Sequence, residues 1–374
     1  MDAHSALEIA PNPIERVDRP LNIVQICSAR QPRYGAVIAM MTLARTLRSM
    51  GHNVSFVGFQ GREFADYARR EGFEAIEVKV RTKIDPIAVV QVARYLRNSN
   101  ADVVQGHLSS ACLLAGLAGR LANVPSVSTV HGMSGKLSYI AAERLIAVSE
   151  GVRRHLLSQG VPSKRISVVH NGIDSFPHRI TRDEACERLG LPRDRRYFGT
   201  TARLAPIKGI NVAIEALSKL PSSMRSYDYV VAGDGAEREN LLNLAERLGV
   251  RDRVRLIGFV KDPEVLLALL DLFVLPSLQE ALSVSLLEAM DCSLPMVVSN
   301  VGGVPEVVDS QCAMQVPAND SGALAAAIAA VLADPLRRDQ MSIHANKRFQ
   351  EHFTADLMAQ SMVSIYQELL AKPR

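Results

Sequence analysis

The fold class is decided by residues 21–59, which read LNIVQICSARQPRYGAVIAMMTLARTLRSMGHNVSFVGF. Leu21 to Cys27 is an apolar run of strand length, and a helical pattern from about Ala36 to Met50 ends at Gly51. Asn53 to Phe59 is a second run of the same kind. Such strands joined by a helix are typical of a parallel sheet covered by helices on both faces.

The alternation of strands and helices continues and then restarts once. Further strands are expected at residues 75–80, 103–106, 126–130, 144–148 and 166–169. A turn signal at Asn171-Gly172 and a break at Pro177 mark a boundary. Beyond it, strands are expected at 197–202, 228–232, 254–257, 272–275 and 295–299, and residues 321–370 have an all-helical pattern. The sequence therefore predicts an α/β protein with two doubly wound, Rossmann-like domains facing each other across a cleft.

The expected division of the chain follows from this boundary. Residues 1–20 are expected to be a flexible leader, 21–177 the N-terminal domain and 178–355 the C-terminal domain. The last segment, 356–374, is expected to form a helix that returns to the N-terminal domain. A length of 374 residues fits two or three domains of about 150 residues each.

Composition and charge exclude several classes of protein. The chain is 48% hydrophobic and 22% charged, which excludes a disordered, collagenous or disulfide-stapled protein. Its net charge of +4 is too small for a dedicated nucleic-acid binder. The charge is uneven, with 21 Lys/Arg against 14 Asp/Glu in residues 1–177 and 22 against 25 in the remainder. Either ordinary scatter or an acidic partner of the N-terminal half, such as a membrane surface, explains this difference.

The chain carries no sequence signal for export or for a membrane span. The first 19 residues contain four acidic side chains and no apolar core, unlike a signal peptide, and no apolar run reaches the ~18 residues of a spanning helix. The five cysteines are widely spaced, and no Cys-x-x-Cys pair occurs. We expect most of them to be buried as small hydrophobic side chains, in a cytoplasmic protein.

Several common cofactor and catalytic motifs are missing. The chain has no G-x-x-x-x-G-K loop, and Gly233-Asp234-Gly235 supplies only the first two glycines of a dinucleotide fingerprint. Residues 131–135, HGMSG, lack the spacing of a G-x-S-x-G nucleophile. The nine histidines are scattered without metal-ligand spacing. We therefore expect neither a metal nor a dinucleotide cofactor.

An anion site is expected where residues 276–290, PSLQEALSVSLLEAM, follow a strand. From about Ser283 this segment reads as a helix, whose N-terminal N–H groups and dipole favour an anion. Glu280 precedes the helix and Glu288 lies inside it, so both carboxylates can face one cleft and accept hydrogen bonds from paired hydroxyls. Alternatively, Glu280 caps the helix and Glu288 is a solvated surface charge.

Two cations follow the strand expected at 197–202. Arg203 stands at its carboxyl end, and Lys208 stands five residues later at a helix start. Such a pair can converge on a diphosphate, which Arg binds as a fork and Lys as a point charge. A lysine at a helix N-terminus opposes the helix dipole, so helix stability does not explain it. The alternative is two solvated surface cations.

These segments, taken in order, resemble those of retaining glycosyltransferases of family 4, the group 1 type with the GT-B fold. The resemblance covers roughly residues 21–372. Its motifs are Gly35, residues 129–132 TVHG, 147–150 AVSE, 171–174 NGID, the Arg203/Lys208 pair, 233–235 GDG, Glu280-x7-Glu288, 294–298 LPMVV and 302–306 GGVPE.

The resemblance implies a nucleotide-sugar donor, held mainly by the C-terminal domain without a metal. Arg203 and Lys208 would neutralise the leaving diphosphate, and Glu280 would contact the sugar hydroxyls. His131 would line the cleft near the reacting carbon. The remaining donor-binding residues are implied to be Gly35, Gly233, Ser283, Val284 and Glu288, with Glu288 on the ribose.

The expected function is transfer of a hexose-type sugar from a UDP- or GDP-sugar to a glycan or lipid-linked acceptor, in surface polysaccharide or lipopolysaccharide synthesis. The alternatives are a sugar-nucleotide epimerase of the same architecture and a non-catalytic nucleotide-sugar-binding protein. Peripheral contact with an anionic membrane is a further hypothesis, in which residues 36–50 and Arg45 and Arg48 face the lipid. The other interpretation is that the apolar face of this helix is core.

Overall fold

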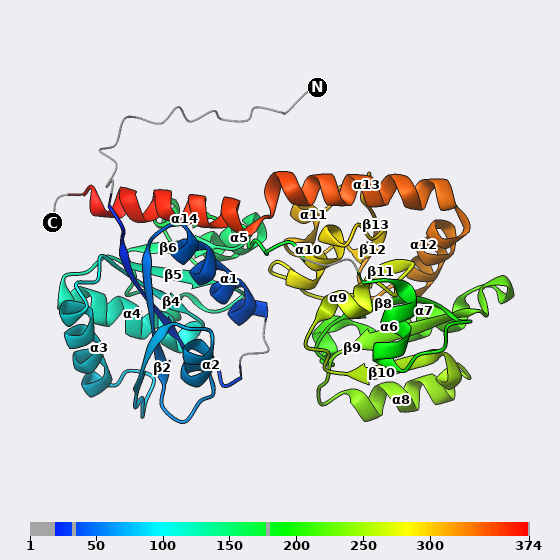
Figure 1. The fold of residues 1–374 in the computed structure, drawn as a ribbon, viewed down its shortest axis with the longest axis horizontal. Coiled ribbons are helices and arrows are strands. Elements are labelled where there is room, and N and C mark those ends of the chain that lie inside the picture. Colours follow the sequence, from blue (N-terminus) through cyan, green and yellow to red (C-terminus); the bar gives the residue numbers. More distant parts are fainter. Residues whose placement is uncertain (1–18, 32–34, 177–179, 373–374) are drawn as a thin grey trace, which may run out of the picture.

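The computed structural model describes residues 19–31, 35–176 and 180–372, and in them the chain forms two parallel sheets with helices on both faces (Figure 1). The first sheet has the strand order β3-β2-β1-β4-β5-β6-β7. Its strands are β1 (Asn22–Cys27), β2 (Asn53–Phe59), β3 (Glu74–Val78), β4 (Val103–His107), β5 (Ser126–Val130), β6 (Arg144–Ala147) and β7 (Ile166–Val168). Its helices are α1 (Gly35–Ser49), α2 (Phe64–Arg70), α3 (Pro86–Asn98), α4 (Ser109–Ala122) and α5 (Glu150–Ser158), with short 3₁₀ turns at Lys136–Ser138 and Ser163–Arg165.

The second sheet repeats this plan with the order β10-β9-β8-β11-β12-β13. Its strands are β8 (Arg196–Thr201), β9 (Tyr227–Ala232), β10 (Val254–Gly258), β11 (Leu272–Leu275), β12 (Met296–Ser299) and β13 (Ala313–Val316). Its helices are α6 (Arg182–Leu189), α7 (Ile210–Lys219), α8 (Arg238–Arg247), α9 (Pro263–Leu267), α10 (Val284–Asp291), α11 (Val304–Val307), α12 (Ser321–Ala333) and α13 (Pro335–His352), with 3₁₀ turns at Pro206–Lys208, Ser222–Met224 and Arg251–Arg253. The predicted pair of doubly wound domains is confirmed.

Each sheet has a topological switch point. There the chain stops adding strands on one side of the first strand of the sheet and begins to add them on the other side. In the second sheet this point lies between β8 and β11, and in the first it lies between β1 and β4. Loops leaving the carboxyl ends of such strand pairs diverge and leave a crevice for a ligand. The loops that contain Arg203 and Glu280 follow β8 and β11, so the structure places both at the same switch point.

The apolar faces of both sheets are buried against the helices. In α1, nine residues are buried: Leu43 and Leu47 pack with residues of β1, β4 and α14 (Ala355–Leu370), and Met41 packs with Phe56 of β2. The interpretation of its apolar face as core is therefore right, and that face does not meet lipid. Four of the five cysteines are buried, Cys292 is half-buried, and all five are free thiols, as expected.

Two helices at the end of the chain connect the sheets. In Figure 1, α13 lies along the second sheet and α14 (Ala355–Leu370) lies along the first, beside α1. Met358, Met362 and Tyr366 of α14 are buried in the same cluster as Leu43 and Leu47 of α1. The predicted boundary at Pro177 lies outside the described residues, as does the expected leader up to Asp18.

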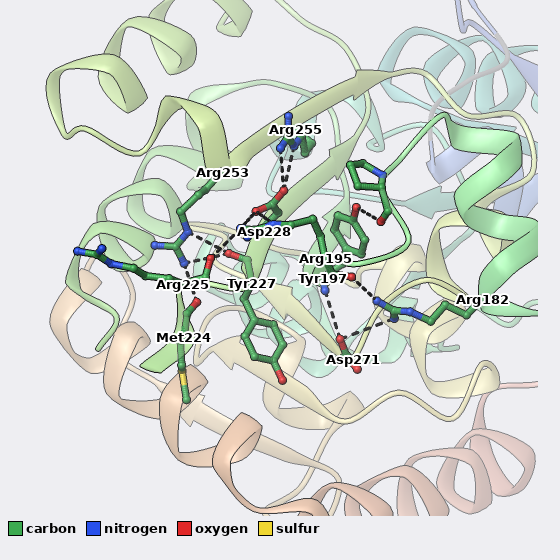
Figure 2. Close-up of polar contacts among 11 residues, drawn as sticks. Arg182, Arg195, Tyr197, Met224, Arg225, Tyr227, Asp228, Arg253, Arg255 and Asp271 are labelled. Carbon is green, nitrogen blue, oxygen red and sulfur yellow. Dashed lines mark hydrogen bonds and ion pairs between the residues drawn. The ribbon is translucent and has the colours of Figure 1, made fainter. Parts of the chain in front are cut away.

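An arginine-rich cluster ties together the amino ends of the second sheet, the edge opposite the switch point (Figure 2). Asp228 of β9 is fully buried and accepts hydrogen bonds from Arg195 and from Arg255, the latter at 3.0 Å. Asp271, before β11, pairs with Arg196 at 2.8 Å and with Arg182 at 3.7 Å. Arg182 and Arg195 also donate to backbone carbonyls, so the cluster holds the sheet rather than a ligand.

Candidate nucleotide-sugar site

The loops after β8 and β11 are joined by an ion pair between two of the predicted residues. Lys208 Nζ lies 2.5 Å from Glu280 Oε1, and Ser277 Oγ donates to the same carboxylate oxygen at 2.7 Å. The Glu280 carboxylate is buried, whereas Lys208 is half-buried. Two partners thus fix the position of the Glu280 carboxylate, whose oxygens are of the kind that accepts hydrogen bonds from sugar hydroxyls. The alternative reading of Glu280 as a helix cap is wrong, since it contacts Lys208 and Ser277 instead.

The backbones of the two loops also lie against each other. Leu278 N donates to Ile207 O at 2.8 Å. Gly209 has a φ of +61°, and a Cβ at this position would overlap the carbonyl oxygen of Pro276. Glycine is required there because it alone combines this left-handed backbone with such a close approach. The order Lys208-Gly209 therefore brings the lysine next to the loop that carries Glu280.

Glu288 lies on the buried side of α10 and is not a solvated surface charge. Only 7% of this residue is exposed, and its Oε2 accepts from Thr201 Oγ1 at 3.5 Å, at the end of β8. Burial raises the pKa of Glu288 to about 7, and the Thr201 hydrogen bond opposes this only in part. A carboxyl group of this kind can change its charge when a hydroxyl-bearing ligand arrives.

The N-termini of two helices from different domains meet beside these residues. Ser283 is the N-cap of α10 but makes no side-chain capping hydrogen bond; its Oγ lies 2.9 Å from Ser285 Oγ. Val284 begins α10, and a Cβ on Gly35, the first residue of α1, would lie 3.5 Å from its Cγ2. The first N–H groups of each helix lack intrahelical acceptors, and both dipoles are positive here. The arrangement favours a ligand with more than one negative charge.

The other two donor-side residues lie on the neighbouring turns. Arg203 is exposed just after β8, in the same loop as Lys208. Gly233 follows β9, donates its N–H to Gly258 O at 2.7 Å and lies against the Ala202 carbonyl. The structure thus gathers Arg203, Lys208 and Gly233 on adjacent strand ends.

His131 is paired with a histidine that sequence reasoning missed. His131 Nε2 lies 3.0 Å from His107 Nδ1, and the two rings stack with centroids 5.4 Å apart. Burial lowers the pKa of His131 to about 4 and lowers that of His107 as well, so both imidazoles are neutral near pH 7. The remaining nitrogens, His131 Nδ1 and His107 Nε2, are buried without a protein partner. In the sequence each histidine stands at the end of an expected strand, and the structure adds that these two strands, β4 and β5, are neighbours.

A small cavity lies behind this pair, between the first sheet and helices α1 and α14. Its volume is about 20 Å³, and it is lined by Met40, Gln105, Asn171 and Met358 as well as the two histidines. Such a volume holds about one water molecule.

Among the residues that the structure describes, no three His, Cys, Asp or Glu side chains are grouped so as to hold a metal ion. Within the same residues, no helix combines the length and hydropathy that crossing a bilayer requires.

Comparison with known families agrees with both halves of the chain. Residues 181–348 match the model of the glycosyl transferases group 1, and residues 34–175 match that of glycosyltransferase family 4. Together these matches cover the second sheet, all of the first sheet except β1, and most of the helices around them.

Two curated relatives from Escherichia coli match part of the chain. The O-antigen biosynthesis glycosyltransferase WclY is 30% identical over 212 residues, which cover 56% of this chain and 57% of the relative. The UDP-Gal:alpha-D-GlcNAc-diphosphoundecaprenol alpha-1,3-galactosyltransferase is 32% identical over 243 residues, covering 59% and 63% respectively. The chain therefore spans less than two thirds of the length of these relatives.

Among solved structures, the Anabaena protein Alr3699/HepE in complex with UDP-glucose superimposes with a TM-score of 0.81. The superposition covers 92% of this chain and 99% of that one, at 21% sequence identity. At this level of identity the likeness establishes the fold, with two sheets facing each other, and leaves the ligand to be argued from the residues of the site.

Proposed function

The chain belongs to the group 1, family 4 type of glycosyltransferases, and we propose that it transfers a hexose-type sugar from a UDP- or GDP-sugar to a glycan or lipid-linked acceptor. The observation that carries the proposal is the ion pair between half-buried Lys208 and buried Glu280 at the switch point of the second sheet, where buried Glu288 contacts the end of β8. Cations and carboxylates gathered at one strand edge fit a ligand that has both a diphosphate and hydroxyl groups.

In the proposed donor complex each residue has a separate task. The N-termini of α10 and α1 receive the diphosphate through Ser283, Val284 and Gly35, while Glu288 accepts hydrogen bonds from the ribose hydroxyls. Glu280 receives hydroxyls of the transferred sugar in place of its present partner Ser277.

The charge that develops on the leaving diphosphate is proposed to be neutralised by Arg203 and Lys208, so that no metal is needed. We further propose that the anomeric configuration is retained, with a departing phosphate oxygen accepting the acceptor proton on the same face of the sugar. The sugar–phosphate bond breaks and the acceptor oxygen bonds to the anomeric carbon. The neutral His131 lines the acceptor side, since it follows β5 in the other domain.

The substrate class is supported by the names of the relatives. WclY is an O-antigen enzyme, the galactosyltransferase uses UDP-Gal and an acceptor linked to diphosphoundecaprenol, and HepE holds UDP-glucose. By analogy we propose that this chain acts in surface polysaccharide or lipopolysaccharide synthesis, on the cytoplasmic side of a membrane.

A contact with an anionic membrane is part of this proposal, through a surface other than α1. The segment from Lys79 to Val90, between β3 and the first turns of α3, exposes three cationic and three aliphatic side chains. Ile84 is 61% exposed and Ile87 is 55% exposed. Aliphatic side chains flanked by cations suit the interface of an anionic bilayer. Cosedimentation with phosphatidylglycerol vesicles, but not with phosphatidylcholine vesicles, is expected and should be lost in Ile84→Glu.

The donor proposal is tested by thermal shift across UDP- and GDP-sugars, followed by NMR of the product formed without an acceptor. A donor that binds only the folded state raises the melting temperature. A glycosyltransferase slowly releases free sugar and nucleoside diphosphate, whereas an epimerase returns a nucleotide sugar with an inverted carbon. Binding without any product would instead indicate a non-catalytic nucleotide-sugar-binding protein.

A further inference from the structure

A carboxylate of the second domain binds the beginning of a helix in the first. Glu306 lies on α11, and its two oxygens accept from the backbone N–H groups of Glu150 at 2.6 Å and Gly151 at 2.7 Å. These N–H groups open α5, where the helix dipole favours a negative charge. His170 Nε2 lies 3.2 Å from the same carboxylate. Glu306 is therefore held by three groups of the first domain.

The residues just before α11 contact the proposed sugar-binding loop on one side and α5 on the other. Gly302 has a φ of +54°, and a Cβ on it would overlap the carbonyl oxygen of Glu280. Gly303 N donates to Glu280 O at 3.3 Å, and a Cβ on Gly303 would lie 2.8 Å from Ser149 Cβ. A Cβ on Gly151 would in turn lie 3.0 Å from Gly302 O. No side chain separates these three backbone segments.

The two sets of contacts form one continuous connection from the first domain to Glu280. Glu306 binds the start of α5. The Gly302-Gly303 turn packs between α5 and the backbone of Glu280. Arg348 in turn holds α11, because its Nε donates to Val307 O at 2.7 Å. Ser149 Oγ already caps α5 through Val152 N at 3.2 Å. The helix thus has a cap of its own, and Glu306 adds a connection between the domains.

We infer that Glu306 is a positioning residue, which fixes the loop of Glu280 relative to the first domain and so sets the donor sugar against the acceptor side. This inference rests on the proposed function, because it presumes that Glu280 holds the sugar. In the proposed donor complex most contacts to the nucleotide come from the second domain, from Glu288 and the N-terminus of α10, and the first domain adds only the N-terminus of α1 at Gly35. Loss of Glu306 should therefore impair turnover far more than nucleotide binding, because a displacement of about 1 Å at the reacting centre can cost ~10²-fold in rate.

The test compares Glu306→Ala and Glu306→Gln with Glu150→Gln, a matched control. The control removes a charge at the same helix end, where the side chain pairs with Arg153 Nη1 at 2.6 Å, and leaves the backbone N–H groups in place. In Glu306→Ala, kcat for nucleotide-sugar hydrolysis should fall roughly ten- to hundredfold, with UDP affinity within about threefold of wild type. Glu306→Gln, which keeps an acceptor oxygen, should recover part of the rate, and Glu150→Gln should match wild type.

Hydrogen exchange separates failure of this inference from failure of the proposed function. In Glu306→Ala, faster exchange is expected both at the start of α5 and in residues 280–283, whether or not the protein is an enzyme. If exchange increases only at α5, or if kcat and UDP affinity fall in parallel, the positioning role is wrong. Should wild type bind no nucleotide sugar while the exchange result holds, the proposed function fails and the connection between domains stands.

Discussion

The charge of Glu288 should control donor binding near neutral pH. The carboxyl group is buried in the free protein, with a pKa raised to about 7, whereas its proposed partners are the two ribose hydroxyls, which donate best to an ionised carboxylate. Binding and ionisation are therefore coupled, and affinity for a nucleotide sugar should rise with pH.

The size of this effect follows from the pKa. If only the ionised form binds, the competent fraction is about 9% at pH 6 and about 91% at pH 8, so the dissociation constant should fall about tenfold between them. The stability of the fold should instead fall as the pH rises, because a carboxyl group with a raised pKa keeps its proton to a higher pH in the folded state than in the unfolded state. Between about pH 4.5 and pH 7 the Glu288 carboxyl ionises in the unfolded chain but still holds its proton in the folded protein, so the free energy of unfolding should fall by up to ~3 kcal/mol across this range.

Calorimetric titration with UDP-glucose from pH 6 to pH 8 measures the binding effect, because the phosphodiester of this ligand does not titrate in that range. Glu288→Gln is the matched control, since its amide has nearly the same shape and no charge to lose. Its affinity should be weaker at pH 8 and independent of pH. A tenfold dependence that persists in Glu288→Gln, or a wild-type affinity that does not change with pH, would refute the coupling.

Three further predictions concern the fold and the site. Asp228→Ala removes the carboxylate that pairs with Arg195 and Arg255 and should lower the free energy of unfolding by about 3–5 kcal/mol. The control, Asp194→Ala at an exposed position, should change it by less than ~0.5 kcal/mol. Urea unfolding measures both values. Gly209→Ala should lower the free energy of unfolding by clearly more than the ~1–2 kcal/mol expected for Gly190→Ala. Both glycines have a φ near +60°, but only a Cβ at Gly209 would overlap a neighbouring carbonyl. Equal losses in the two variants would contradict the close approach at Gly209. Lys208→Met should reduce nucleotide-sugar hydrolysis at least ~10²-fold, and a rate near wild type in a folded variant would exclude the lysine from the reaction.

The sheets could be predicted well because their strands are buried on both faces. A strand such as Leu272–Leu275 is then apolar throughout, and its length and position can be read from the sequence. β13 was missed because this four-residue edge strand, AMQV, contains a half-exposed Met314 and an exposed Gln315. The prediction of the doubly wound order needed only the alternation of strands with helices.

The residues of the site could be named from local motifs, but their contacts could not. Lys208 and Glu280 are 72 residues apart and meet because β8 and β11 are neighbours, which the sequence alone does not state. The pairing of His107 with His131 depends in the same way on β4 lying beside β5. Glu306 was recognised only as part of a motif, and its connection to α5 depends on how the two domains face each other.

The central claim is that the Lys208–Glu280 pair belongs to a site that cleaves the bond between a sugar and a nucleoside diphosphate. The most direct measurement is release of nucleoside diphosphate from UDP- and GDP-sugars, with EDTA present, by wild type and by Glu280→Ala. We predict that wild type consumes at least one donor under these conditions and that Glu280→Ala is at least ~10²-fold slower with its fold intact. Equal rates for the two proteins, or no consumption of any donor by wild type, would contradict the claim.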